Sequence, residues 1–266
     1  MRTIKVYAAS TGAQFGDQPE NYGDNLMSPL LRELFNIDPQ FVEMARADLI
    51  GIGSILDSYH RRKGVNPLRR RPWRALHAWG SGYMNSKGMA YWPQRLTVHA
   101  VRGPLSLDKI GLLNIPMGDP ALLLPLIWPK PAKTTAAVSV IPHFITHADF
   151  VRSHSSSLPK NWRIIDLLGD PKTITEHIAS SDVVVSSSLH GLIVADAYGV
   201  PSVWMEGDRR IKGDGFKFQD YIGFRGQPIA GPISYSDILH RFPEPTAAVV
   251  PSSDTQDKLL QAMPFA

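Results

Sequence analysis

The stretch SSSLHGLIVADAYGVPSVW, Ser186 to Trp204, decides the fold class together with the β-branched run that leads into it from Asp182. A short apolar run of this kind predicts a buried strand, and the apolar spacing from Leu192 onward predicts the buried face of a helix. The stretch therefore predicts a strand that passes directly into a helix. That unit is typical of a parallel α/β sheet.

Three serines and a histidine stand at the point where this strand becomes a helix. The free N–H groups of a first helical turn, together with the hydroxyls of Ser187 and Ser188, form a site for an anion. His190 falls within that turn, where an imidazole strengthens the attraction and can deliver a proton. Gly191 permits another segment to approach closely. The alternative is ordinary capping of the helix by serine.

Strand and helix patterns alternate along the rest of the chain, which predicts parallel sheets with helices on both faces. Strands are expected at Ile4–Ala8, Leu49–Ile52, Leu76–Trp79, Thr97–Val101, Ala136–Ile141, Trp162–Leu167, Val183–Ser186 and Ser202–Met205. Helices are expected at Asn25–Phe35, Pro104–Ile110, His147–Ser153, Thr173–Ser180, Leu189–Tyr198 and Thr255–Met263.

The proline-rich segment Leu124–Thr135 is interpreted as a linker. We therefore predict two Rossmann-like domains, residues 1–130 and residues 131–266, with the last helix a candidate to pack back on the first domain. Open α/β sheets bind ligands beyond the carboxyl ends of their strands. The predicted site is thus a central cleft that the two domains face.

Two residues directly after predicted strands suit an anionic ligand in such a cleft. Arg102 ends an apolar strand, and a guanidinium pairs bidentately with carboxylate or phosphate. An ion pair with a neighbouring helix is the alternative for Arg102. His143 follows the strand at Ala136–Ile141 and is a candidate phosphate ligand or acid. Its alternative is an imidazole satisfied by backbone groups.

The turn after the first strand carries NYGDNL, Asn21 to Leu26, where a helix is expected to begin. Asp24 is a candidate general base for a sugar hydroxyl, with Asn21 and Asn25 as candidate acceptor contacts. The alternative for these residues is helix capping. Tyr83 is a candidate for stacking on a sugar ring, although aromatic residues at this density also form cores.

Composition excludes several kinds of site. The chain has 266 residues and no cysteine, so disulfides, thiolate metal sites and cysteine nucleophiles are excluded. No dense cluster of Asp, Glu and His is visible, and neither a metal nor a cofactor is expected. No apolar run is long enough for a membrane span, and the first residues do not resemble a secretory signal. A cytoplasmic location is expected.

The formal net charge of +4 is concentrated locally. The stretch Arg61–Arg74 holds seven Lys or Arg residues and no acidic one. Such a patch fits an anionic membrane surface, a phosphorylated substrate or nucleic acid, and the alternative is a solvated loop. Because no nucleic-acid-binding motif accompanies it, we expect no nucleic acid partner.

Taken together, the motifs resemble those of the polysaccharide pyruvyl transferase family, of the succinoglycan and xanthan type. The resemblance spans nearly the whole chain. Its motifs are NYGDNL, ADLIGIGSIL, VRGPLSLDKIG, MGDPALLL, VIPH, SSDVVVSSSLHGLIVADAYGVPSVW, FKFQDYIG and LLQAMPF. The resemblance implies a GT-B-like fold and transfer of pyruvate from phosphoenolpyruvate to two hydroxyls of one sugar. The product is a cyclic ketal, and phosphate is released.

By the same resemblance, Arg102 and His190 hold phosphoenolpyruvate. The helix start with Ser187, Ser188 and Leu189, and also His143, would match the negative charge of this donor. His190 is the candidate acid or phosphate ligand, and Asp24 is the candidate base. The family often carries Arg at the position of Ser188, so a nearby cation such as Arg209, Arg210 or Lys212 would have to replace it. The expected acceptor is a lipid-linked oligosaccharide, which Arg61–Arg74 would meet at the inner face of the cell membrane.

Two other functions fit the same motifs. A GT-B glycosyltransferase would use the helix-start anion site for a sugar nucleotide. A non-catalytic partner in polysaccharide assembly would use the cleft only for binding.

Overall fold

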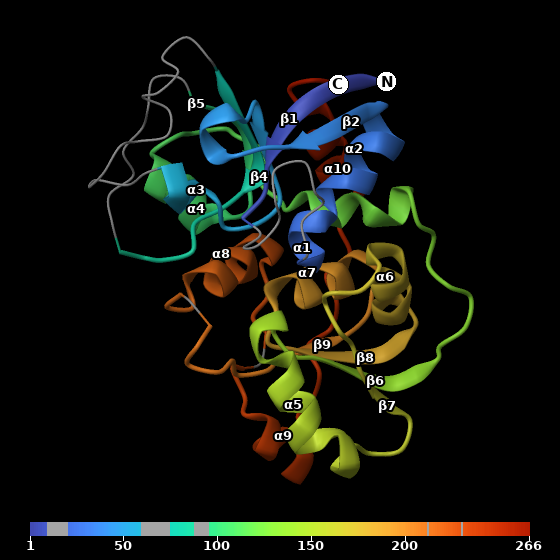
Figure 1. Ribbon diagram of the computed structural model, residues 1–266. Helices are drawn as coiled ribbons and strands as arrows, with labels where there is room; N and C mark the ends of the chain where they lie inside the picture. Colours follow the sequence, from blue (N-terminus) through green and yellow to red (C-terminus); the bar gives the residue numbers. More distant parts are fainter. Residues whose placement is uncertain (10–20, 60–74, 88–95, 212, 230) are drawn as a thin grey trace. The chain divides into compact units, whose positions relative to one another are not determined.

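The computed structural model describes residues 1–9, 21–59, 75–87, 96–211, 213–229 and 231–266 (Figure 1). The chain divides into two compact units. Unit 1 comprises Met1–Pro120, Gly213–Gly226 and Ser252–Ala266, and unit 2 comprises Ala121–Lys212 and Gln227–Pro251. This division falls earlier than the boundary predicted near residue 130, and two later segments return to unit 1.

Unit 1 is built on a five-stranded parallel sheet in the order β2-β1-β3-β4-β5. The strands are β1 Arg2–Tyr7, β2 Ile37–Phe41, β3 Leu49–Ile50, β4 Leu76–Ser81 and β5 Leu96–Val101. Strand β2 was not among the expected strands, and its sequence IDPQF contains Pro39. Proline has no N–H to donate, and β2 tolerates it because β2 is an edge strand of the sheet.

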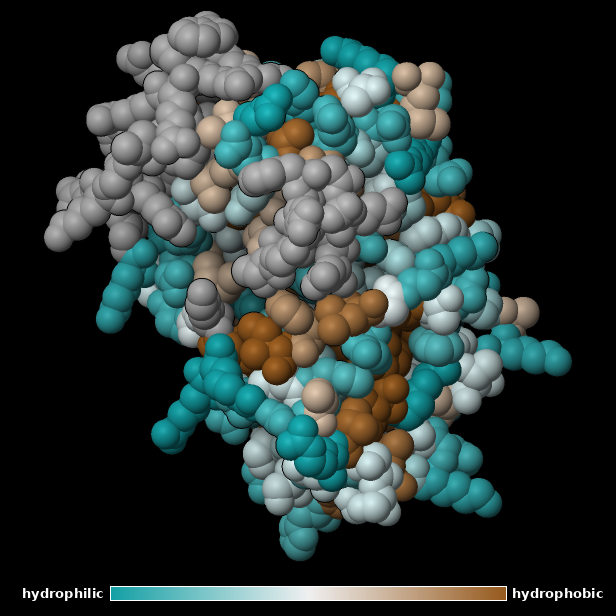
Figure 2. Space-filling model, in the orientation of Figure 1, coloured by the Kyte–Doolittle hydropathy of each residue, from teal (hydrophilic) through white to brown (hydrophobic). Residues whose placement is uncertain are grey.

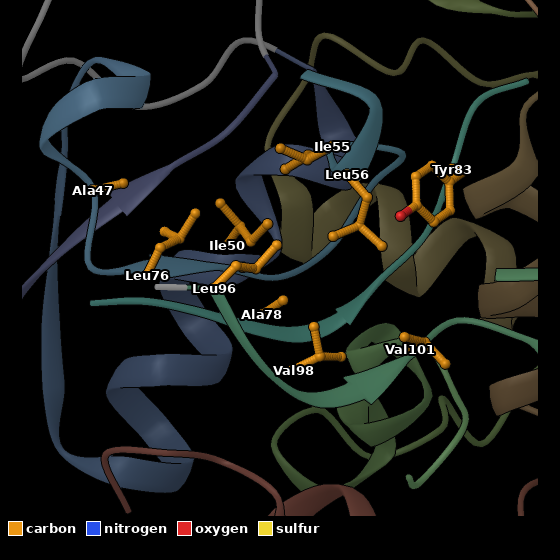
Figure 3. Close-up of a cluster of buried hydrophobic side chains, with 10 residues drawn as sticks. All are labelled: Ala47, Ile50, Ile55, Leu56, Leu76, Ala78, Tyr83, Leu96, Val98 and Val101. Carbon is orange, nitrogen blue, oxygen red and sulfur yellow. The ribbon is translucent and has the colours of Figure 1, made fainter. Parts of the chain in front are cut away.

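Helices cover both faces of this sheet. They are α1 Tyr22–Asn25, α2 Met27–Phe35, α3 Leu56–Tyr59, α4 Pro104–Ile110, α8 Phe216–Arg225 and α10 Ser253–Gln261. On one face the buried strand residues Ile50, Ala78 and Val98 belong to one cluster (Figure 3). Leu107 of α4 packs against this cluster. On the other face the ring of Trp79 contacts Phe35 of α2, and its Nε1 donates to the Leu259 carbonyl of α10, 2.8 Å away.

Unit 2 is built on a four-stranded parallel sheet in the order β7-β6-β8-β9. The strands are β6 Ala136–Ile141, β7 Trp162–Ile164, β8 Ser181–Ser186 and β9 Ser202–Trp204. The helices are α5 His147–His154, α6 Pro171–Ala179, α7 Leu189–Ala197 and α9 Tyr235–His240.

The core of unit 2 has two sides. Val140 and Val185 of the sheet pack with Phe150 of α5 and Ile238 of α9 on one side, and α6 and α7 lie along the other (Figure 1). Nearly every residue of α7 is buried, which explains why its sequence is apolar throughout rather than amphipathic. The prediction of an α/β fold with two parallel sheets is confirmed.

Within the part of the chain that the structure describes, no helix combines the length and the apolar character that a membrane crossing requires. On the one face seen in Figure 2, hydrophilic residues cover most of the coloured surface, and hydrophobic residues gather in smaller groups.

Candidate functional site

Three of the predicted site residues, Arg102, His143 and Ser187, follow the carboxyl ends of parallel strands. In unit 1, Arg102 follows β5 directly, and Ser54 follows β3 closely. In unit 2, His143 follows β6, and Ser187 follows β8. Since all strands within a sheet are parallel, these ends share one edge in each unit.

Arg102 is fully buried and holds a fixed position in unit 1. Its Nε donates to Oδ2 of Asp220 at 3.1 Å, and its Nη2 donates to the Tyr83 carbonyl at 2.7 Å. Its Nη1 donates to Oγ of Ser54 at 2.7 Å. The guanidinium plane lies against Gly82, where any side chain would collide with it. The ion pair with a neighbouring helix, the alternative considered for Arg102, is therefore present.

Asp220 of α8 is the residue that organises this contact, and sequence reasoning missed it. Its Oδ1 accepts from the backbone N of Ser106 at 2.8 Å, and its Oδ2 accepts from the Ser106 hydroxyl at 2.6 Å. Asp220 thus ties the start of α4 to Arg102 as well as to α8. In the sequence, Asp220 is marked only by its place in the FKFQDYIG motif. That motif does not indicate that Arg102, 118 residues earlier, is its partner.

Lys217, one turn before Asp220 on α8, is a second buried cation that sequence reasoning missed. Only 9% of it is exposed. Its Nζ lies 5.3 Å from the ring centre of Phe218, and no described carboxylate forms an ion pair with it. Burial, and then the positive charge of Arg102, lowers the pKa of Lys217 to about 8. An anion bound beside it would favour the charged form.

Asp24 is a buried carboxyl group with an unusual proton affinity. It lies within α1 rather than at its cap, which is Asn21. Burial raises the pKa of Asp24 to about 7, and the nearby charge of Asp119 adds to this. Hydrogen bonds from the Asn21 side chain (3.2 Å) and the Ala9 backbone act in the opposite direction. A carboxylate with a pKa near neutrality is suited to accept a proton from a hydroxyl.

The other candidate acceptor contacts of unit 1 differ in exposure. Asn21 and Asn25 are half-buried at the two ends of α1. The ring of Tyr83 is 1% exposed and belongs to the core cluster shown in Figure 3. Nζ of Lys109 lies 4.5 Å from the centre of this ring. Stacking on a sugar requires a free ring face, and the ring of Tyr83 packs in the core, so Tyr83 is not among the acceptor contacts proposed below.

In unit 2, the turn between β8 and α7 is held by serine hydroxyls. Oγ of Ser186 accepts from the backbone N of Ser188 at 3.0 Å, and it lies 2.8 Å from the Ser188 carbonyl oxygen, to which it donates. Oγ of Ser187 accepts from the backbone N of His143 at 3.0 Å, which joins the ends of β6 and β8. Ser188 is the N-cap residue of α7, but its side chain makes no capping hydrogen bond.

The first turn of α7 places His190 beside this turn, with Leu189 buried before it. A Cβ on Gly191 would overlap the hydroxyl of Ser186, so the turn requires glycine there. Nδ1 of His143 accepts from the backbone N of Ile145 at 3.4 Å, and the ring stacks on Phe144. Backbone hydrogen bonding, the alternative for His143, is thus observed at one ring nitrogen.

The cations named as replacements for an arginine at Ser188 are in different situations. Arg210 donates from Nη1 to Asp149 at 2.7 Å and from Nε to Asp208 at 3.0 Å, so its charge is already paired. Arg209 is exposed. Lys212 and the basic stretch Arg61–Arg74 lie outside the described residues.

Among the described residues, no three His, Asp or Glu side chains are grouped closely enough to hold a metal ion. The chemistry available from these residues is that of cations, helix-start N–H groups, an imidazole and a carboxyl group with a raised pKa.

Comparisons of the sequence with known proteins point to one family. The sequence pattern of the polysaccharide pyruvyl transferase family matches residues 21–209. The succinoglycan biosynthesis protein ExoV of Rhizobium meliloti (strain 1021) is 25% identical over 246 residues, which is 86% of this chain and 67% of that protein. The uncharacterized protein L143 of Acanthamoeba polyphaga mimivirus is 29% identical over 137 residues, 48% of each chain.

Among solved structures, ADP-heptose lipopolysaccharide heptosyltransferase II of E. coli is similar to 98% of this chain, over 99% of its own length. The sequence identity is 11% and the TM-score is 0.39.

Proposed function

Because the chain belongs to the polysaccharide pyruvyl transferase family, we propose that it transfers pyruvate from phosphoenolpyruvate to two hydroxyls of one sugar. The product is a cyclic pyruvate ketal in an exopolysaccharide repeat unit. The observation that carries this proposal is that the matched residues 21–209 include Asp24, Arg102, His143 and His190. Except for Asp24, each of them lies just beyond the carboxyl end of a strand in its own sheet.

The donor carries several negative charges, and the proposed ligands are matched to them. The start of α7 offers N–H groups, the hydroxyls of Ser187 and Ser188, and the imidazole of His190. The backbone at Leu189 belongs to the same turn. His143 is tied to that turn through Ser187. Together these groups form the proposed donor site of unit 2.

Arg102 is the proposed donor ligand of unit 1. Its Nε and Nη2 both contact Oδ2 of Asp220, and Nη2 also donates to the Tyr83 carbonyl. Its Nη1 donates to the neutral hydroxyl of Ser54. The Ser54 contact is the one that a substrate oxygen can replace with least loss, because it involves no charge on the acceptor. Lys217, beside Arg102, supplies the second cation of this site and compensates for the absence of an arginine at Ser188.

The proposed reaction begins with a proton added to the methylene carbon of phosphoenolpyruvate, with His190 as the donor. Cationic character develops at the neighbouring carbon, which one sugar hydroxyl attacks as Asp24 accepts its proton. The bond from that carbon to the phosphate oxygen then breaks, and the second hydroxyl closes the ring. The sugar gives up two hydroxyl protons. One replaces the proton that His190 gave to the methylene carbon, and the other leaves with phosphate.

The arrangement of the two units around a common cleft is part of this proposal, as in the GT-B-like fold that the resemblance implies. Asn21, Asp24 and Asn25 would face the acceptor from unit 1. The acceptor is proposed to be a lipid-linked oligosaccharide at the inner face of the cell membrane, where Arg61–Arg74 meets anionic groups.

A donor screen tests the proposal. The purified protein is incubated with acceptor oligosaccharides and either phosphoenolpyruvate or a panel of sugar nucleotides. Acceptor-dependent release of phosphate from phosphoenolpyruvate supports the proposal. Release of nucleotide in place of phosphate supports the glycosyltransferase function instead, and release of neither supports the non-catalytic one.

A further inference from the structure

A cavity of about 320 Å³ lies within unit 2, next to the proposed donor site. Pro142 after β6, Ser187 after β8 and Met205 after β9 form its floor at the carboxyl edge of the sheet. Helix α5 and the start of α9 form its walls. A volume of this order accommodates one or two sugar-sized rings.

The wall of the cavity is aromatic. Phe150 and His154 of α5 and Tyr235 of α9 contact one another, with each pair of ring centres 4.7 Å apart. Phe150 and Tyr235 also pack against the sheet core, which fixes the orientation of their rings. Aromatic rings present apolar faces against which the C–H face of a sugar ring packs favourably.

The rim of the cavity is polar and carries more negative than positive charge. Three carboxylates line it, those of Asp149, Glu206 and Asp208, together with the guanidinium of Arg210. Arg210 is held between Asp149 and Asp208 by hydrogen bonds of 2.7 and 3.0 Å. These bonds lower the pKa of both aspartates, so they stay ionised at neutral pH.

This charge balance selects the class of ligand. Phosphoenolpyruvate or a nucleoside diphosphate would meet three carboxylates, and the guanidinium groups of Arg210 and Arg152 are already engaged by Asp149 and Asp208. An uncharged saccharide has hydroxyls that donate to carboxylate oxygens, and oxygens that accept from the guanidinium. Aromatic faces with carboxylates at the rim therefore suit a neutral sugar better than an anion.

We propose that this cavity is the saccharide subsite of the enzyme. It holds a sugar ring of the acceptor against Phe150, whose ring is supported from the core by the buried ring of Tyr235, with Asp208 and Arg210 binding its hydroxyls. The inference rests on the proposed function, and it assigns part of acceptor recognition to unit 2. Ser187 lines the cavity and also belongs to the proposed donor site, so the acceptor lies beside the donor, as transfer requires.

Binding is tested with the whole chain by saturation-transfer NMR against a panel of neutral methyl glycosides of hexoses, deoxyhexoses and N-acetylhexosamines at millimolar concentration. The variants are Phe150→Leu, which keeps an apolar side chain but removes the ring, and Arg210→Gln. The matched controls are Phe242→Leu, which removes another ring of unit 2 that contacts Trp162, and Arg32→Gln, which breaks an exposed ion pair with Asp38.

We expect at least one glycoside to bind, and each cavity variant to weaken it at least about fivefold, while the controls leave it unchanged. In the transfer assay the KM for the acceptor rises by a similar factor, and the KM for phosphoenolpyruvate does not. Binding of no glycoside by the wild-type protein would overturn the inference, as would binding that both cavity variants retain.

The two proposals fail in different ways. If glycosides bind in a cavity-dependent manner and phosphoenolpyruvate is never consumed, the subsite stands and the proposed reaction does not. If ketal forms with an unchanged acceptor KM in Phe150→Leu and Arg210→Gln, the reaction stands and the subsite does not.

Discussion

The guanidinium of Arg102 and the carboxylate of Asp220 form a buried ion pair, with Nη2 of the arginine 3.0 Å from Oδ2 of the aspartate. The two side chains are 1% and 0% exposed. The pair joins the end of β5 to α8, a helix that follows in the chain only after the whole sheet of unit 2. It therefore fixes both the fold of unit 1 and the position of a proposed donor ligand.

Asp220→Asn is expected to destabilise the protein by about 3–5 kcal/mol in urea unfolding, because it leaves the buried charge of Arg102 without compensation. Replacing both residues, as in Arg102→Met with Asp220→Leu, should recover much of this loss while abolishing activity. The control Arg32→Gln breaks an exposed pair and should cost less than about 1 kcal/mol. If the Asp220→Asn variant were as stable as this control, the claim that Arg102 is buried and that Asp220 compensates its charge would be wrong.

The raised pKa of Asp24 predicts a pH dependence of catalysis. A base must be ionised, so kcat/KM should rise with pH up to about 7 and stay level until Lys217 loses its proton near pH 8. Asp24→Asn should lower kcat by about 10²–10⁴ and remove this dependence. Asp119→Asn removes a neighbouring negative charge and should shift the rise to lower pH. If kcat/KM of the Asp24→Asn variant still rose near pH 7, the rise would come from the titration of another group.

The same carboxyl group predicts how stability changes with pH. The pKa of Asp24 is higher in the folded than in the unfolded chain, so the folded state binds the proton more tightly. This contribution is complete below the unfolded pKa of about 3.8 and is lost as the pH rises to about 7. At about 1.4 kcal/mol per pKa unit it amounts to roughly 4 kcal/mol. Asp24→Asn should therefore be the more stable protein above pH 7, by an amount that urea unfolding measures.

Lys217 is expected to act on donor binding. Lys217→Met should raise the KM for phosphoenolpyruvate about ten- to a hundredfold, because a charge-assisted contact is lost. In the wild-type enzyme this KM should also rise above pH 8, where Lys217 loses its proton. The control Lys258→Met removes an exposed lysine paired with Asp254 and should leave the KM unchanged. Equal KM values in the two variants would remove Lys217 from the donor site.

Gly191→Ala tests the turn that begins α7. The added methyl group would overlap the hydroxyl of Ser186, which holds the backbone of Ser188. We expect a loss of about 1–3 kcal/mol in stability and a larger loss of activity, because the helix start must shift. In Gly169→Ala the nearest atoms would be 3.7 Å away, and this control should be near neutral. Full activity in Gly191→Ala would mean that the turn does not bind the donor.

Much of the fold follows from local pattern. The strand predicted at Ala136–Ile141 coincides with β6, and the helix predicted at Pro104–Ile110 coincides with α4. β2 was missed because Pro39 argues against a strand unless the strand is known to lie at an edge. The last helix was expected to pack back on the first domain, and α10 belongs to unit 1, where Trp79 donates to Leu259. The return of α8 was out of reach, because it depends on contacts between distant segments such as Arg102 and Asp220.

The site was predictable where position along a strand decides it. Arg102, His143 and the serines after β8 stand at strand ends because the hydrophobic runs before them stop there. Their partners could not be predicted in the same way, since Asp220 and Lys217 lie on a helix whose neighbour is known only from the folded chain. For Tyr83 the sequence left two interpretations, because an aromatic residue near a strand end is as suited to a core, where this ring lies, as to a ligand.

The most direct test is the mass of the product formed from phosphoenolpyruvate and cell-derived lipid-linked oligosaccharides. The wild-type protein should add one pyruvate as a ketal and release one phosphate per transfer. His190→Ala should remain folded and lose about 10²–10⁴ in rate, while His240→Ala, at an exposed position of α9, should retain the wild-type rate. A product without pyruvate, or a folded His190→Ala variant that turns over at the wild-type rate, would contradict the account.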